Sequence, residues 1–144
     1  MKYITIALLM ASGLVSTAQA RSQVDCLARM AYFEARGEGV VGRRAVMDVT
    51  LNRAEHKEFA NTVCGNLTGD QYQWVKKNPK VRDPFLYAQF KQEADAVYAA
   101  HVLGERQDST NGAYFFSSNG VKPAKRAYRK SRVGGHTFYG LKPL

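Results

Sequence analysis

The chain has few cysteines, few prolines, and no Asp or Glu beyond Asp108. Its three histidines lack metal-ligand spacing and its two cysteines do not complete a zinc motif, so we expect no metal and no cofactor. Four prolines, with no internal repeat or low-complexity tract, exclude a disordered or repeat chain. The 144 residues, 45% of them hydrophobic, predict one globular domain.

Positive charge is in excess, because 21 Lys and Arg residues face 12 Asp and Glu, for a net charge of +9. Such a balance favours a polyanionic partner, whether nucleic acid, an anionic membrane surface or another polymer. The excess is concentrated near the C-terminus, in Lys122, Lys125, Arg126, Arg129, Lys130 and Arg132. This basic stretch is either a solvated loop or a surface that attracts an anionic polymer.

The N-terminus resembles a secretory signal. Lys2 precedes an apolar run, Ile4 to Val15, which is followed by the small-residue pattern Ala18-Gln19-Ala20. We predict a signal peptide over 1–20 and a mature domain over 21–144. The alternative is an uncleaved anchor, but the run is shorter than the roughly 20 residues that span a bilayer. We therefore expect an exported, periplasmic or extracellular monomer with no membrane span after cleavage and no nucleic-acid partner.

The mature chain would carry only Cys26 and Cys64. Export places them in an oxidising compartment, which favours a disulfide, and the alternative is two buried free thiols. A bridge closing this loop contributes about 4 kcal/mol in the chain-entropy treatment.

Apolar periodicity predicts three helices: Val24 to Arg36, Val40 to about His56, and Asp83-Pro84 to Gly104. The second is apolar around much of its circumference, so we expect it to be central. The third begins with an N-cap residue followed by proline.

The remaining segments lack helical periodicity. The segment 61–82 is predicted to be a loop or lid, whereas 113–116 and 133–139 are short, aromatic and glycine-flanked, as in small strands or extended loops. The predicted fold is α+β and predominantly α, with a helical N-terminal body and a small extended or β C-terminal section.

Glu34 is the strongest candidate for chemistry. It shares a helix face with Leu27, Met30 and Ala31 and lies in the last helical turn. Burial and the negative end of the helix dipole both raise a carboxyl pKa, which suits a general acid. The alternative is a structural ion pair with Arg29, Arg36 or Arg53. Glu38, one turn further on, is either a second carboxylate or an ordinary solvated residue.

Several motifs resemble the SleB/CwlJ-type cell wall hydrolases. They are Cys26-Leu-Ala28, Tyr32-Phe-Glu-Ala-Arg-Gly-Glu38, Val41-Gly42, Leu51-Asn-Arg53, Asn61-Thr-Val-Cys-Gly65 and the closing Val133-Gly-Gly-His136 with Phe138-Tyr139. The resemblance implies a lysozyme-like, lytic-transglycosylase-like catalytic domain that cleaves β-1,4 bonds of peptidoglycan glycan strands. It also implies that Glu34 is the catalytic acid and that Cys26 pairs with Cys64.

Two segments depart from the family pattern. Tyr72-Gln-Trp74 stands where relatives have phenylalanine, serine and tryptophan, and Ala113-Tyr-Phe-Phe-Ser-Ser118 replaces a cluster of histidine, tyrosine and histidine. A role for those histidines therefore cannot be transferred to this chain.

Sugar rings bind to aromatic faces, so the substrate-contacting candidates are aromatic or polar residues near these motifs: Tyr32, Glu38, Tyr72, Trp74, Tyr114, Phe116, His136 and Tyr139. Each large aromatic has a core position as its alternative. Trp74 is favoured because it lies in a polar segment. His101 is expected to be a satisfied core histidine, and Asn52 and Arg53 are expected to support Glu34.

Glycoside hydrolysis usually uses two carboxylates, and only Glu34 is a firm candidate here. This predicts a single-acid mechanism in which the muramyl C6 hydroxyl closes on C1, giving a 1,6-anhydromuramyl product. The alternatives are a non-catalytic peptidoglycan-binding envelope protein and a secreted nucleic-acid binder or nuclease.

Overall fold

The computed structural model describes residues 17–144, so the apolar run of the predicted signal peptide lies outside the described residues. The first helix, α1 (Thr17–Ala35), extends further toward the N-terminus than the predicted start at Val24 and includes the predicted cleavage site. Two further long helices follow, α2 (Val40–Glu55) and α4 (Pro84–Val102). No helix of residues 17–144 is both long and apolar enough to cross a membrane.

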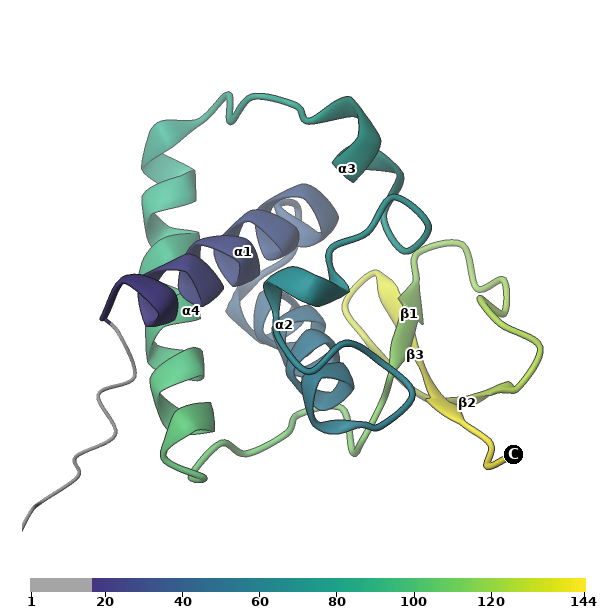
Figure 1. Ribbon diagram of the computed structural model, residues 1–144. Coiled ribbons are helices and arrows are strands. Elements are labelled where there is room, and N and C mark those ends of the chain that lie inside the picture. The colour runs from purple at the N-terminus through teal and green to yellow at the C-terminus, as the bar shows by residue number, and fades with distance from the viewer. Residues whose placement is uncertain (1–16) are drawn as a thin grey trace, which may run out of the picture.

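Helix α2 is the centre of the molecule, as its composition predicts. Its residues from Ala45 to Arg53 are all buried, and it packs against α1, α4 and the strands (Figure 1). Because side chains on every face of α2 are covered, even the polar residues Asp48 and Asn52 must find partners inside the protein.

Helix α4 begins as the sequence predicts. Asp83 caps it, accepting a hydrogen bond from the Leu86 amide at 2.9 Å, and Pro84 occupies the first turn. It buries Phe90, Ala94 and Val97 against the other two long helices.

The segment 61–82 is not wholly a loop. It contains a 3-10 turn, η1 (Cys64–Asn66), and a one-turn helix, α3 (Gln73–Lys77), which ends at Asn78 in the left-handed conformation with φ of 41°. Five residues are too few to show a period of 3.6, so the pattern did not predict α3. This correction matters because α3 carries Trp74.

Three strands form an antiparallel sheet in the order β1-β3-β2, from β1 (Phe115–Ser117), β2 (Ala127–Val133) and β3 (His136–Leu141). The α+β, predominantly α architecture is therefore confirmed. The central strand β3 is buried from His136 to Gly140. Most of the predicted basic loop is instead strand β2, because its backbone pairs with β3 while charged side chains such as Arg129 point to solvent.

The predicted disulfide is confirmed. Cys26 in α1 and Cys64 in η1 are bridged, with Cα atoms 5.3 Å apart, and neither is a free thiol. The bridge fastens the segment before α3 to the helical body.

Candidate active site

A cleft of about 740 Å³ opens where the end of α1, the α3 segment and the sheet meet. Its lining combines two carboxylates, four large aromatic rings and a polar rim: Phe33, Glu34, Ala35, Gly37, Glu38, Gln71, Tyr72, Gln73, Trp74, Phe116, Ser117, Ser118, Asn119 and His136. A smaller cavity of about 260 Å³ shares Glu34, Gln71, Tyr72 and Phe116 with it and adds Arg53. Glu34 thus lies where two hollows adjoin.

Glu34 is half-buried in the last turn of α1, as predicted from its helix face. Burial raises the pKa of its carboxyl group above the ordinary value. Two weaker influences oppose the rise, namely a hydrogen bond from Trp74 Nε1 to Oε1 at 2.9 Å and the positive charge of Arg53. Among residues 17–144 no cation lies within ion-pair distance of Glu34, so the structural ion pair with Arg29, Arg36 or Arg53 is not formed.

Trp74 is held beside Glu34 by contacts to α1. Its ring centroid lies 4.9 Å from that of Phe33. The Arg29 guanidinium lies over both rings, 5.9 Å from the Trp74 centroid and 5.0 Å from the Phe33 centroid. Arg29 also donates hydrogen bonds to the Asn78 side chain and the Pro79 carbonyl, just beyond α3. The one-turn helix is therefore pinned to the helix that carries the acid, which fixes the indole donor.

Arg53 approaches the cleft from α2. It is 4% exposed and donates to the Tyr114 carbonyl at 2.6 Å and to the Tyr72 hydroxyl at 3.3 Å. Arg53 therefore acts on Glu34 through its charge, and separately it donates a hydrogen bond to Tyr72 in the cleft lining. The expected support from Asn52 is wrong, because its side-chain amide donates to Asp108 and the Ala113 carbonyl instead.

Glu38 and His136 form a second wall of the cleft. Glu38 Oε1 accepts a hydrogen bond from the Gly135 amide at 2.9 Å and lies 3.5 Å from His136 Nδ1. Burial lowers the pKa of His136, against the opposing effects of the Glu38 charge and the Glu34 backbone. The Phe116 ring meets the imidazole edge-on at 5.2 Å.

A family model described as Cell Wall Hydrolase matches residues 37–139. The chain belongs to the cell wall hydrolase family. No curated protein and no solved structure matches the chain. The family assignment makes this protein a hydrolase that acts on peptidoglycan, which lies outside the cytoplasm, and the disulfide fits that location.

The match includes Glu38, Tyr72, Trp74 and His136 but begins just after Glu34. The role of Glu34 in this cell wall hydrolase therefore depends on its geometry and on the resemblance of the motif around it. No grouping of three or more His, Cys, Asp and Glu side chains that could hold a metal ion occurs in the described part of the hydrolase.

Three tyrosines predicted to contact substrate lie elsewhere. Tyr32 is 1% exposed, with its ring against Phe90 and its hydroxyl accepting from the Asp83 amide. Tyr139 is 3% exposed and donates to the Gly120 carbonyl.

Tyr114 packs on His56 and Phe59, outside the cleft. All three tyrosines pack against other side chains instead of lining the cleft, because burial of a large aromatic ring stabilises the fold.

His101 is also placed differently from the expectation. It is partly exposed on α4, and its Nδ1 lies 3.4 Å from Glu55 without a hydrogen-bond partner among residues 17–144. It is not the satisfied core histidine that its helix face predicts.

The polar rim of the cleft was missed at the level of sequence. Gln71, Gln73, Ser117, Ser118 and Asn119 line it beside the predicted aromatics. Their only sequence cue is adjacency to Tyr72, Trp74 and Phe116, because small polar residues carry no periodic pattern.

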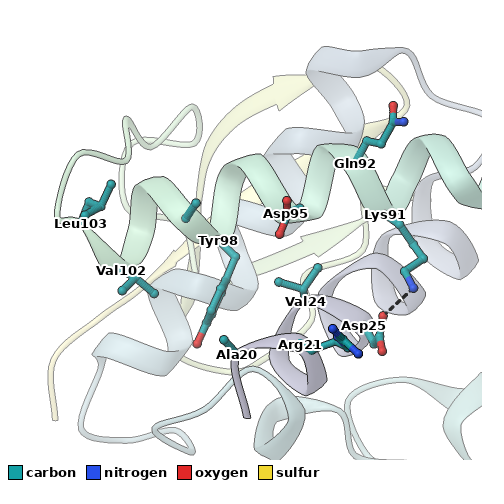
Figure 2. A pocket seen from close by; sticks show the side chains of 11 residues that line it. Ala20, Arg21, Val24, Asp25, Lys91, Gln92, Asp95, Tyr98, Val102 and Leu103 are labelled. Carbon is teal, nitrogen blue, oxygen red and sulfur yellow. Dashed lines mark ion pairs between the residues drawn. The ribbon is translucent and has the colours of Figure 1, made fainter. Parts of the chain in front are cut away.

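A second large pocket lies between α1 and α4 (Figure 2). Val24, Tyr98, Val102 and Leu103 give it an apolar lining, and its Asp25 is paired with Lys91 at 2.9 Å. It shares no residue with the cleft.

Proposed function

We propose that this cell wall hydrolase is a lytic transglycosylase that cleaves the β-1,4 bond between N-acetylmuramic acid and N-acetylglucosamine, with Glu34 as its one catalytic acid. The observation that carries the proposal is a half-buried carboxyl group of raised pKa at the junction of two hollows, hydrogen-bonded to Trp74. A carboxyl group of raised pKa stays protonated at pH values where an ordinary glutamate is ionised, as a general acid requires.

In the proposed mechanism, the protonated Glu34 donates its proton to the glycosidic oxygen and the bond from that oxygen to the muramyl C1 breaks. The C6 hydroxyl of the same sugar then attacks the oxocarbenium-like C1, and Glu34 accepts the hydroxyl proton. The acid is regenerated, no water is consumed, and the product carries a 1,6-anhydro ring. The Trp74 N–H stabilises the Glu34 carboxylate that exists between the two proton transfers.

The cleft lining supports a glycan substrate. Trp74, Tyr72 and Phe116 offer ring faces for apolar sugar faces, while Gln71, Ser118 and Asn119 offer polar groups for sugar hydroxyls. We further propose that residues 1–20 direct export and that the enzyme works as a monomer in the periplasm or outside the cell.

A second candidate reaction is muramidase-type hydrolysis. Glu38 lines the same cleft as Glu34, and inverting glycosidases place a general base about 6.5–9.5 Å from the acid with a water between the two. Under this alternative, Glu38 would activate that water and the products would carry reducing muramyl ends.

The test compares wild type with Glu34→Gln, which keeps the side-chain volume but removes the proton. We expect release of soluble muropeptides from purified peptidoglycan to fall about 1,000-fold, while pull-down with intact sacculi is retained. Glu105→Gln is the matched control, because Glu105 is exposed and does not line the cleft.

Mass spectrometry of the wild-type digest then identifies the reaction. Anhydromuramyl ends support transglycosylation, and only reducing ends would refute it in favour of hydrolysis. Undiminished release by Glu34→Gln would refute the assignment of the acid. A wild-type protein that binds sacculi and releases nothing would indicate the non-catalytic peptidoglycan-binding alternative.

A further inference from the structure

We propose that Glu38 is a positioning residue: its carboxylate ties the helical body to the turn between β2 and β3 and so places the His136 wall of the cleft, and it does not act as the second catalytic carboxylate. The inference rests on the proposed function of the cleft, since it assigns Glu38 a role in the reaction of Glu34.

The backbone of Glu38 is fixed to the helical body. Its amide donates to the Ala35 carbonyl at the end of α1, at 2.9 Å. Its carbonyl accepts from Arg43 Nε in the first turn of α2, also at 2.9 Å, and the same guanidinium is paired with Glu93 of α4 at 3.0 Å. Contacts that involve all three long helices therefore fix the backbone position of Glu38.

The carboxylate of Glu38 is enclosed by backbone. Oε1 accepts from the Gly135 amide, 97 residues away in the chain. A Cβ atom at Gly134 or Gly135 would collide with the carboxylate, and one at Gly42 would press on Glu38 from the other side. Gly134 also has a φ of 57°, which favours glycine. Three glycines thus make room for this side chain, which is only 19% exposed.

A general base needs an oxygen free to accept a proton from a water in the cleft. Here Oε1 is engaged by the Gly135 amide and lies beside His136 Nδ1, while Oε2 faces Gly42 and Gly134. The carboxylate is arranged as a structural acceptor for a backbone donor, which leaves Glu34 as the carboxyl group at the junction of the hollows.

The turn depends on this contact. The other polar contact at Gly134 and Gly135 among residues 17–144 is the Arg132 guanidinium on the Gly134 carbonyl at 3.4 Å, within the hairpin itself. Losing Glu38 therefore removes the polar contact that joins these two glycines to the helical body, while the neighbouring Val133 keeps its packing against the core. The next residue, His136, would then shift relative to Phe116 and Glu34.

The first experiment compares Glu38→Gln with Glu38→Ala. Glutamine keeps an oxygen acceptor of the same reach, so we expect kcat within about threefold of wild type, whereas alanine removes the acceptor of a charge-assisted hydrogen bond and should lower kcat about 20-fold. The ratio of anhydro to reducing ends should not change. Glu105→Ala serves as the matched control for removal of a glutamate.

The second experiment does not require activity. Amide hydrogen exchange at Gly135 should become about 20-fold faster in Glu38→Ala and stay near wild type in Glu38→Gln. The NMR titration of His136 should move to lower pH in Glu38→Gln, because the Glu38 charge raises the pKa of His136 against burial. The groups facing His136 are Glu38, the Glu34 backbone and the uncharged Phe116 ring, so Glu38 is the charge being tested.

Three outcomes would overturn the proposal. If Glu38→Gln is as inactive as Glu34→Gln, Glu38 takes part in proton transfer. If Glu38→Ala leaves both kcat and the amide exchange of Gly135 unchanged, Glu38 does not hold the turn in place. An unmoved His136 titration excludes the electrostatic contact. Full activity of Glu34→Gln would refute the proposed function instead, while the exchange measurement would still decide the role of Glu38.

Discussion

The helical body and the C-terminal sheet section differ in how they are held together. The body, built from α1, α2 and α4, has one continuous apolar core that includes Leu27, Leu51 and Phe90. The sheet section has no acidic residue, exposes much of β2, and keeps a small separate cluster around Phe115 and Tyr139. The body therefore provides stability and the acid, and the sheet section provides one wall of the cleft.

The junction between the two regions combines apolar packing, because Phe138 of β3 belongs to the core of the body, with a network of polar contacts. Asp48, fully buried in α2, pairs with Arg106 at 3.0 Å and accepts from the Ser109 amide and hydroxyl. Asn52 continues the network to Asp108 and the Ala113 carbonyl. Directional hydrogen bonds thus fix the entry into the sheet, while Glu38 fixes the far turn. These polar contacts add direction to the apolar packing of Phe138 and so help to place the cleft wall.

The largest expected effect lies in the body. Replacing both Cys26 and Cys64 with serine should lower the free energy of unfolding by about 4 kcal/mol, measured by urea denaturation. Hydrogen exchange should increase first in η1 and the adjoining part of α1 rather than in β3, because the bridge joins those two elements. An unchanged urea midpoint would contradict this.

A matched pair of variants separates stability from activity. Leu51→Ala, at a fully buried position of α2, should cost about 3 kcal/mol of unfolding free energy and leave kcat of the folded enzyme near wild type. Gly135→Ala should cost about 1 kcal/mol or less but lower kcat about tenfold, since its methyl group displaces the Glu38 carboxylate. If the ratio of stability loss to activity loss is the same in the two variants, the helical body and the sheet section do not differ in their contributions to stability and activity.

A change at α3 should alter the pH profile. Trp74→Phe keeps a ring but removes the N–H that stabilises the ionised Glu34 and lowers its pKa. The pKa of Glu34 should therefore rise further, and the acid should stay protonated to higher pH. The alkaline limb of the pH profile of kcat should move to higher pH. We expect kcat itself to fall about fivefold. A limb that moves to lower pH would contradict the assigned direction.

The smallest effect should come from the exposed charges of the sheet section. Neutralising Lys122, Lys125, Arg129 and Lys130 with glutamine should weaken binding to sacculi about threefold at low salt and flatten its salt dependence. The unfolding midpoint should not change, because these side chains are exposed or only partly buried. Binding with an unaltered salt dependence would show that the basic stretch is a solvated surface only.

The body was more predictable from sequence than the sheet section. The period of α2 and the cap of α4 at Asp83 are local patterns, and Glu34 stood out because its helix face and its place in the last turn both act on one carboxyl group. Strand β2 was hidden by its charges, since an exposed edge strand need not alternate.

What sequence could not supply were the contacts between distant segments. Nothing local indicates that Gly135 meets Glu38 or that α3 brings Trp74 to Glu34. Periodicity also could not separate core aromatics such as Tyr32 from cleft aromatics such as Tyr72, because both are 5% exposed or less and only Tyr72 is in the cleft lining.

The hydrogen bond between Trp74 and Glu34 has a practical consequence. Trp74 is the chain's single tryptophan, so the selectively excited fluorescence of the protein comes from one indole joined to the proposed acid. Its intensity and emission maximum should follow the ionisation of Glu34 and the arrival of a sugar ring in the cleft. The enzyme thus carries an intrinsic optical probe with which ligand titrations and rapid-mixing kinetics can be recorded without a label.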